Sequence, residues 1–104
     1  PYDITTLSFQ TAIDSRDNLP QGIRWSNDGT LLHEIGRSSD RINQFTVSTP
    51  FDISTASFDS FRNAQDDVPT GIAWNNAGTQ LYEVGRNSGD IYQYTVSTGG
   101  WESF

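Results

Sequence analysis

The sequence predicts an all-β fold made of two four-stranded antiparallel units, each a β-propeller blade. Three observations lead to this prediction. Sliding the 104-residue chain against itself by 49 positions pairs residues 1–49 with 50–98 without a gap, and about half of the pairs are identical. Each repeat contains four short strand-like runs, and no stretch keeps a helical spacing. Four antiparallel strands in a repeat of roughly 40 to 50 residues are typical of a propeller blade.

The innermost strand of each unit is predicted at 22–25 and 71–74, where a Gly-Ile-x-Trp run precedes a turn. These turns end at Gly29 and Gly78, and Asn followed closely by Gly indicates a tight hairpin. Residue types along the third strand alternate with period two, as expected for a strand with two unlike faces. The second strands are predicted at 31–35 and 80–84, and the third strands at 41–47 and 90–96.

The outermost strand is predicted at 56–61, after a longer linker, and its N-terminal counterpart is 7–12. The chain therefore contains an outermost strand, then a complete unit, then three further strands. Residues 99–104 look like a truncated outermost strand, so three candidates exist for two units. The two-blade unit thus covers the whole chain, with repeat 1 at 1–49, repeat 2 at 50–98 and the tail at 99–104.

Two blades do not close a propeller, which needs roughly four to eight blades or a few more. We expect copies of the chain to complete a ring through a head-to-tail contact, because a lone pair would expose Trp25, Trp74 and rows of Ile and Val. A trimer, tetramer or pentamer would have six, eight or ten blades. We expect 7–12 to pair across the subunit boundary, so that deleting 1–13 abolishes the oligomer.

The charge balance excludes several classes of partner. The chain contains thirteen Asp and Glu residues, six Arg and no Lys, which gives a net charge of -7. This negative charge disfavours binding to nucleic acid and to anionic membranes. The chain has no Cys, so disulfides, thiolate metal sites and Cys nucleophiles are excluded. No apolar run reaches the roughly 20 residues of a membrane span, and the first residues lack the features of a signal peptide.

Candidate ligand-binding residues lie in two pairs of loops, 13–21 with 36–41 and 62–70 with 85–90. In a propeller, the loops that lead into the innermost strand and those that join the second and third strands share one face. Short polar side chains with Arg can recognise sugar hydroxyls, a carboxylate or a peptide. The alternative, which we favour, is solvated turns. The candidates are Asp17, Arg37, Arg41, Asp66, Arg86 and Asp90.

Glu34 and Glu83 occupy matching positions in the middle of predicted strands. A buried carboxylate needs a partner, and we expect Arg37, Arg86 or a Trp indole to supply one. A satisfied ion pair between blades is favoured over catalysis. A glycosidase pair would need two carboxylates in different environments, whereas the repeat gives both acids the same one.

No catalytic residue, metal ligand or cofactor is predicted. His33 is the only His, and without Cys or a second His it forms neither a zinc site nor a triad. We expect it to pack on its strand. The turn at 27–29 lacks the alternating acids of a calcium loop. Trp25 and Trp74 are expected in the core between blades rather than against sugars.

Five motifs in the second half of the chain are characteristic. They are PFDISTASF at 50–58, PTGIAW at 69–74, NAGT at 76–79, LYEVG at 81–85 and IYQYTVST at 91–98. With these motifs, most of the chain resembles a known family, the repeats of large extracellular, bacterial and phage-associated β-propeller proteins. The resemblance implies the propeller fold and a secreted, cell-surface or virion location. The tail GGWESF resembles an element of tachylectin-like five-bladed lectins, which implies glycan binding.

Three functions follow. The favoured one is a non-catalytic propeller scaffold that recognises a protein or glycan surface and assembles as a ring of identical chains. The alternative is a purely structural designed or excised propeller fragment without a ligand. A glycosidase or lyase propeller is a third, less favoured reading.

Overall fold

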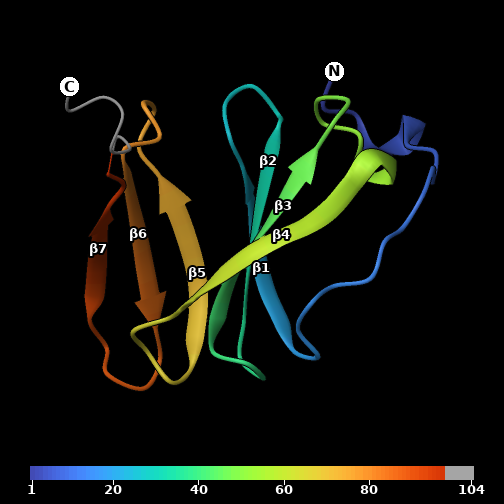
Figure 1. Ribbon diagram of the computed structural model, residues 1–104. Coiled ribbons are helices and arrows are strands. Elements are labelled where there is room, and N and C mark those ends of the chain that lie inside the picture. The colour runs from blue at the N-terminus through green and yellow to red at the C-terminus, as the bar shows by residue number, and fades with distance from the viewer. Residues whose placement is uncertain (98–104) are drawn as a thin grey trace, which may run out of the picture.

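The computed structural model describes residues 1–97, in which seven strands form two antiparallel sheets (Figure 1). In both sheets, strands that follow one another in the chain lie side by side. The all-β prediction is therefore confirmed. The first sheet holds β1 (Pro20–Trp25), β2 (Leu31–Gly36), β3 (Arg41–Val47) and β4 (Ala56–Asn63), and the second holds β5 (Pro69–Trp74), β6 (Gln80–Gly85) and β7 (Ile91–Thr95).

The sequence repeat is also a structural repeat. Ile23 lies opposite Glu34 in the first sheet, and the corresponding Ile72 lies opposite Glu83 in the second. Both innermost strands carry an irregularity between their Pro and Gly, so each begins two residues before the predicted start. Side chains at matching positions therefore face matching directions in the two sheets.

Glycine at positive φ shapes both predicted hairpin turns. Gly29 has a φ of 74° and Gly78 a φ of 71°. Glycine adopts these values with little steric strain because it has no Cβ atom. The loop before the third strand also needs this conformation, and it uses Asp40 in the first repeat and Gly89 in the second. Asp is among the few other residues that tolerate it.

The structure contains two short 3-10 helices that the sequence did not predict, η1 (Ile4–Thr6) and η2 (Ile53–Thr55). Asp3 and Asp52 cap them by accepting a hydrogen bond from a backbone amide two residues later. Tyr2 and Phe51, just before the caps, have φ values of 66° and 64°. A three-residue turn shows no 3.6-residue periodicity, so only the Asp cap marks it in the sequence.

The second sheet has three strands within residues 1–97, not the four of a complete blade. The predicted N-terminal strand at 7–12 forms no strand in the single chain, and Leu7 and Phe9 are exposed. This segment runs down the side of the molecule opposite β7, apart from both sheets (Figure 1). The tail 99–104 lies outside the described residues.

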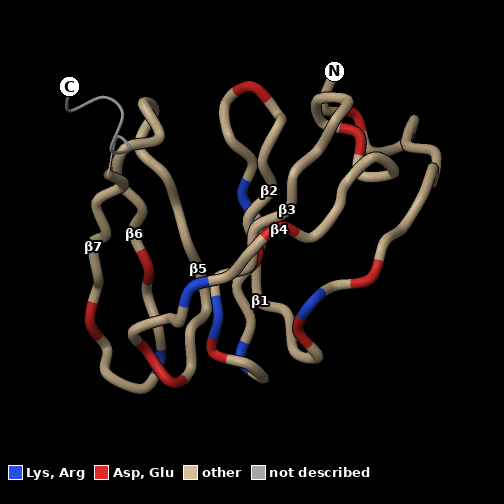
Figure 2. Tube along the Cα trace, in the orientation of Figure 1, with Lys and Arg blue, Asp and Glu red and all other residues tan. Residues whose placement is uncertain are grey.

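Two apolar clusters form the core. One joins the sheets and contains Ile35 and Ile42 from the first with Ile72 and Leu81 from the second. The other lies within the first sheet, where η2 and the start of β4 cover Leu32, Phe45 and Val47. Most charged residues lie in loops at the strand ends (Figure 2). The chain thus stacks two similar sheets and places its polar loops at their edges.

Candidate interaction site

Asp66 ties two loops of the second sheet together. Its buried carboxylate accepts hydrogen bonds from the Val68 amide (2.7 Å), the Asn87 amide (3.2 Å), and the amide (3.1 Å) and hydroxyl (2.7 Å) of Ser88. Burial alone would raise the pKa of Asp66, but these hydrogen bonds outweigh it and lower the pKa from 3.8 to about 2. Asp66 is therefore a charged internal anchor.

Asp17 does the same in the first sheet, bonding the amides of Leu19 (2.7 Å), Ser38 (3.0 Å) and Ser39 (3.0 Å). Burial alone would raise the pKa of Asp17, but the hydrogen bonds outweigh it and lower that pKa. The loops at 13–21 and 36–41 therefore meet, as predicted. Both predicted ligand-binding candidates, Asp17 and Asp66, therefore have buried carboxylates that are hydrogen-bonded within their own loops.

Glycine makes room for both anchors. A Cβ atom on Gly36 would overlap the Asp17 side chain, and one on Gly85 would overlap the Asp66 side chain. The Gly-Arg pairs that end β2 and β6 are therefore packing positions as well as strand ends.

Glu34 and Glu83 are buried, but their partners are not the expected Arg or Trp. Glu34 accepts hydrogen bonds from the Ser15 hydroxyl, the Arg16 amide (3.1 Å) and the Asn43 side chain (3.3 Å). These groups are uncharged, so the predicted ion pair is wrong. The carboxylate instead fixes the segment that leads into the innermost strand.

Glu83 fixes the matching segment of the second repeat. It accepts hydrogen bonds from the amides of Gln65 (3.1 Å) and Asp66 (3.0 Å) and from the Tyr94 hydroxyl. Burial, then the hydrogen bond to Glu83 and its negative charge, raise the pKa of Tyr94. The phenol therefore stays protonated and acts as a donor.

The other four loop candidates have their guanidinium or carboxylate groups at the surface. Arg37, Arg86 and Asp90 are exposed. The guanidinium of Arg41 stacks over the ring of Phe61, with its central carbon 3.9 Å from the ring centre. Arg37 and Arg86 occupy the same repeat position, so both sheets present an Arg at the same edge.

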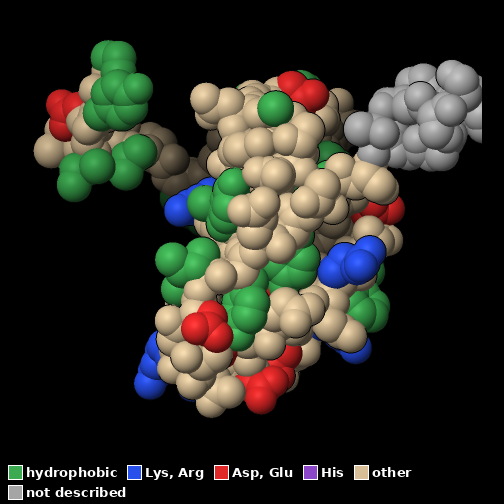
Figure 3. Space-filling view, turned by 90° about the vertical axis from the view of Figure 1, so that its left-hand side faces the viewer, with side chains coloured by type: hydrophobic (Ala, Val, Ile, Leu, Met, Phe, Trp, Pro, Cys, Tyr) green, Lys and Arg blue, Asp and Glu red, His purple; other side chains and the backbone are tan. Residues whose placement is uncertain are grey.

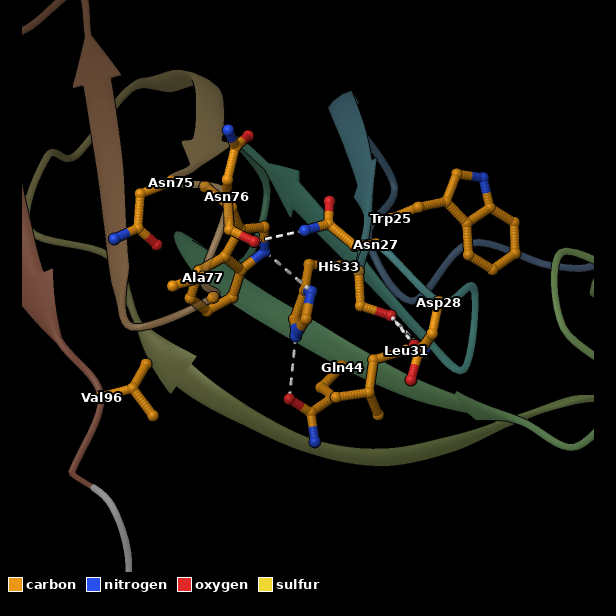
Figure 4. A pocket seen from close by; sticks show the side chains of 13 residues that line it. Trp25, Asn27, Asp28, Leu31, His33, Gln44, Asn75, Asn76, Ala77 and Val96 are labelled. Carbon is orange, nitrogen blue, oxygen red and sulfur yellow. Dashed lines mark hydrogen bonds between the residues drawn. The ribbon is translucent and has the colours of Figure 1, made fainter.

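A cavity of about 390 Å³ lies at the opposite edge, between the turns that follow β1 and β5 (Figure 4). Trp74 and His33 line it. Asn27, on one of these turns, donates a hydrogen bond to the Asn76 carbonyl on the other (Figure 4). None of the six loop candidates lines it. Sequence reasoning missed this site because its residues come from two repeats, and the lone His was its only signal.

Repeat-related apolar residues differ sharply in burial. Ile42 is 6% exposed and the matching Ile91 is 76% exposed. Ile35 is fully buried, whereas Val84 is 43% exposed. The difference reverses on the other side, because Ile72 is 5% exposed and Ile23 is 53% exposed. Each buried residue belongs to the contact between the two sheets.

The exposed residues therefore form two surfaces. One, the β7 surface, is made of Val84 and Ile91. The other, the β1 surface, is centred on Ile23. Figure 3 looks onto the β7 side of the molecule, where hydrophobic side chains lie open between polar atoms. Within one chain, the counterparts of these two surfaces are in contact.

Fold and site together define an all-β protein of two repeat-related antiparallel sheets with an unpaired apolar surface on each side. A scan of protein-family models gave no match to the sequence, and a search of curated proteins gave none either. No group of three or more potential metal ligands occurs in residues 1–97. Over the same residues, no helix is long and apolar enough to span a membrane.

Proposed function

We propose that this protein is a non-catalytic β-propeller scaffold, a relative of the extracellular and phage-associated repeats, that assembles head to tail into a ring of identical chains. Its polar loop edge recognises a protein or glycan surface. The observation that carries the proposal is the unequal burial of Ile42 and Ile91, which share a repeat position.

The contact between the sheets of one chain supplies the geometry for the contact between chains. Ile42 packs against the second sheet, where Ile72 lies. Ile91 corresponds to Ile42, and Ile23 corresponds to Ile72. Repeating the same step places the β7 surface of one copy against the β1 surface of the next. Such a contact joins unlike surfaces, so it propagates and closes into a ring when the rotation allows.

Burial of these surfaces contributes favourably to association. Complete burial of a Val or Ile side chain contributes about 1.5–3 kcal/mol, and a partly exposed side chain gains a fraction of this. Three side chains of this kind are partly exposed in the single chain, namely Ile23, Val84 and Ile91. A trimer, tetramer or pentamer then yields six, eight or ten blades.

The carboxylates support a scaffold rather than an enzyme. Glu34 and Glu83 accept hydrogen bonds from backbone amides in both sheets, and these bonds hold the linkers in place. Neither carboxylate lines the cavity between the sheets. Each accepts a hydrogen bond from a backbone amide at the same repeat position, Arg16 for Glu34 and Gln65 for Glu83.

The polar edge supports recognition. Arg37, Arg86 and Asp90 are exposed there, and the loops that carry them are fixed by the buried carboxylates of Asp17 and Asp66. A ring would repeat each Arg around one face. Guanidinium groups held in a fixed array suit carboxylates and sugar hydroxyls.

Two charged variants test the assembly. Ile91→Glu blocks the β7 surface and leaves the β1 surface intact, and Ile23→Glu does the reverse. We expect each variant alone to be monomeric by light scattering. An equimolar mixture should form a dimer that cannot grow, because only one productive contact exists. Variants that keep the size of the native assembly would contradict the head-to-tail contact.

Gly89→Asp is the matched control. It adds the same negative charge two residues before Ile91, at a position that holds Asp40 in the first repeat. Its positive φ suits Asp in that repeat. We expect this variant to assemble like the native protein.

A glycan array and a hydrolase substrate panel test recognition. Selective binding that is lost in the Arg37→Ala/Arg86→Ala variant, without turnover, supports the binding scaffold. Silence in both assays supports the purely structural alternative. Turnover would identify a glycosidase or lyase and overturn the proposal.

A further inference from the structure

Phe51 closes the upper end of the first sheet. Its ring lies 5.3 Å from the Trp25 ring, measured between centres, at an angle of 57°. It occupies the space where a side chain on Gly29 would lie, and its amide donates to the Gly29 carbonyl at 3.0 Å. Gly29 is buried as a result.

The second sheet has the same Trp and Gly positions, but no described residue packs over its Gly as Phe51 packs over Gly29. Trp74 and Gly78 correspond to Trp25 and Gly29. A Cβ atom on Gly78 would have no neighbour within 4 Å among the described residues, and Gly78 is exposed. Val96 is 44% exposed, whereas the matching Val47 is 3% exposed beneath η2 and β4.

The edge of the second sheet is open as well. β3 pairs with β2 on one side and β4 on the other, whereas β7 pairs only with β6 within residues 1–97. An unpaired edge is a template for another strand.

The N-terminal segment repeats the segment that contains Phe51 and η2. Tyr2 corresponds to Phe51 and shares its positive φ, and η1 repeats η2. Tyr2, Ile4, Leu7 and Phe9 are all exposed. This N-terminal segment and β7 lie on opposite sides of one molecule (Figure 1), so they meet only if they belong to different copies.

We propose that residues 2–13 of a second copy complete the second sheet. Tyr2 covers Gly78 and Trp74, and 7–13 pairs with β7 as a fourth strand. The inference rests on the proposed function, because the segment leads into β1, which carries Ile23 toward the same β7 surface. Both contacts therefore come from one neighbour.

The first sheet fixes the register. Ser57 lies opposite Thr46, and their hydroxyl oxygens are 3.2 Å apart. The corresponding residues are Ser8 and Thr95, so Ser8 of one copy lies opposite Thr95 of the next. Both positions are exposed in the single chain, so they tolerate substitution.

A disulfide tests this register, because the native chain contains no Cys. The full-length Ser8→Cys/Thr95→Cys variant should give covalent oligomers on a non-reducing denaturing gel after mild oxidation. The control is Ser8→Cys/Thr46→Cys, since Thr46 occupies the same repeat position but already faces Ser57. We expect the control to stay monomeric on the gel.

The experiments distinguish failure of this inference from failure of the proposed ring. If light scattering shows a ring and the Ser8→Cys/Thr95→Cys variant does not cross-link, the inference is overturned and the proposed ring stands. A native protein that is monomeric in solution overturns both. A variant that cross-links in a chain ending at Ser97 but not in the full chain assigns the open edge to the tail, which also overturns the inference.

Discussion

The indole N–H of Trp74 in the second sheet donates a hydrogen bond of 3.2 Å to Nδ1 of His33 in the first. The two rings are 5.0 Å apart between centres. Because Nδ1 accepts, the neutral imidazole carries its proton on Nε2, which donates to Gln44 at 2.9 Å. Gln44 in turn donates to Asp59 at 2.7 Å, so a polar chain runs from the second sheet to β4.

Lowering the pH should weaken this link. Burial lowers the pKa of His33 below its ordinary 6.5, against the opposing effect of the Gln44 hydrogen bond. The unfolded chain then binds the proton more readily than the folded chain, so the free energy of unfolding falls as pH drops below 6.5. Denaturant unfolding between about pH 7 and 5 measures this slope. His33→Tyr, which copies Tyr82 of the second repeat, should remove it, and an unchanged slope in that variant would refute the assignment.

Removing one acceptor from Glu83 should destabilise the fold. In Glu83→Gln, an amide group replaces one carboxylate oxygen and leaves a buried backbone amide without an acceptor, at a cost of about 1–3 kcal/mol. Chemical denaturation measures the loss. The exposed Asp90→Asn removes the same charge and should change stability by less than about 0.5 kcal/mol. Equal stability of the two variants would count against the role of Glu83 as a clamp.

Adding one methyl group at Gly85 should be costly. Its Cβ would overlap the Asp66 side chain, which four hydrogen bonds hold in place, so Gly85→Ala should lose about 1–3 kcal/mol. Gly71→Ala is the control in the same sheet, because its Cβ would meet only Val84 at an ordinary 3.6 Å. Thermal unfolding of both variants measures the difference. A Gly85→Ala variant with native stability would contradict the packing of Asp66.

Truncating Tyr2 should weaken assembly without unfolding the chain. Tyr2 is fully exposed in the single molecule, so Tyr2→Ala removes no internal contact. Losing about 1.5–3 kcal/mol of burial at the subunit boundary corresponds to roughly 10- to 100-fold weaker association. Tyr2→Phe copies Phe51 and should assemble normally. Sedimentation at a series of concentrations measures both, and identical association of Tyr2→Ala and native protein would refute the contact.

Repeated Gly, Pro and Trp positions were enough to predict the strand cores, because backbone geometry selects those residues at turns and sheet contacts. The start of β1 at Pro20 was missed because the irregularity before Gly22 has no signature in composition. Asp17 and Asp66 look like ordinary loop acids in sequence. Only the folded loops reveal that a carboxylate lies directly over a glycine.

The site between the sheets was less predictable. His33 and Trp74 are separated by 41 residues and belong to different repeats, so no local pattern links them. The sequence predicts exposed rows of Ile and Val in a lone pair of blades, but it does not tell Ile91 from Ile42, because the two share one sequence context and only Ile42 is buried. Ile42 is buried because the second sheet packs against it, whereas Ile91 lies on the outer side of the second sheet.

In the proposed ring, the open edge of β7 makes completion of the second sheet a matter of mass action. Amides on the paired strand β3 are protected within a single chain, whatever its concentration. Within residues 1–97, β7 pairs only with β6, so in the proposed ring the amides on its other side gain a partner from the neighbouring copy. Dilution should therefore speed hydrogen exchange along β7 and leave β3 unchanged, which makes one strand of the repeat a reporter of subunit dissociation and its twin the internal reference.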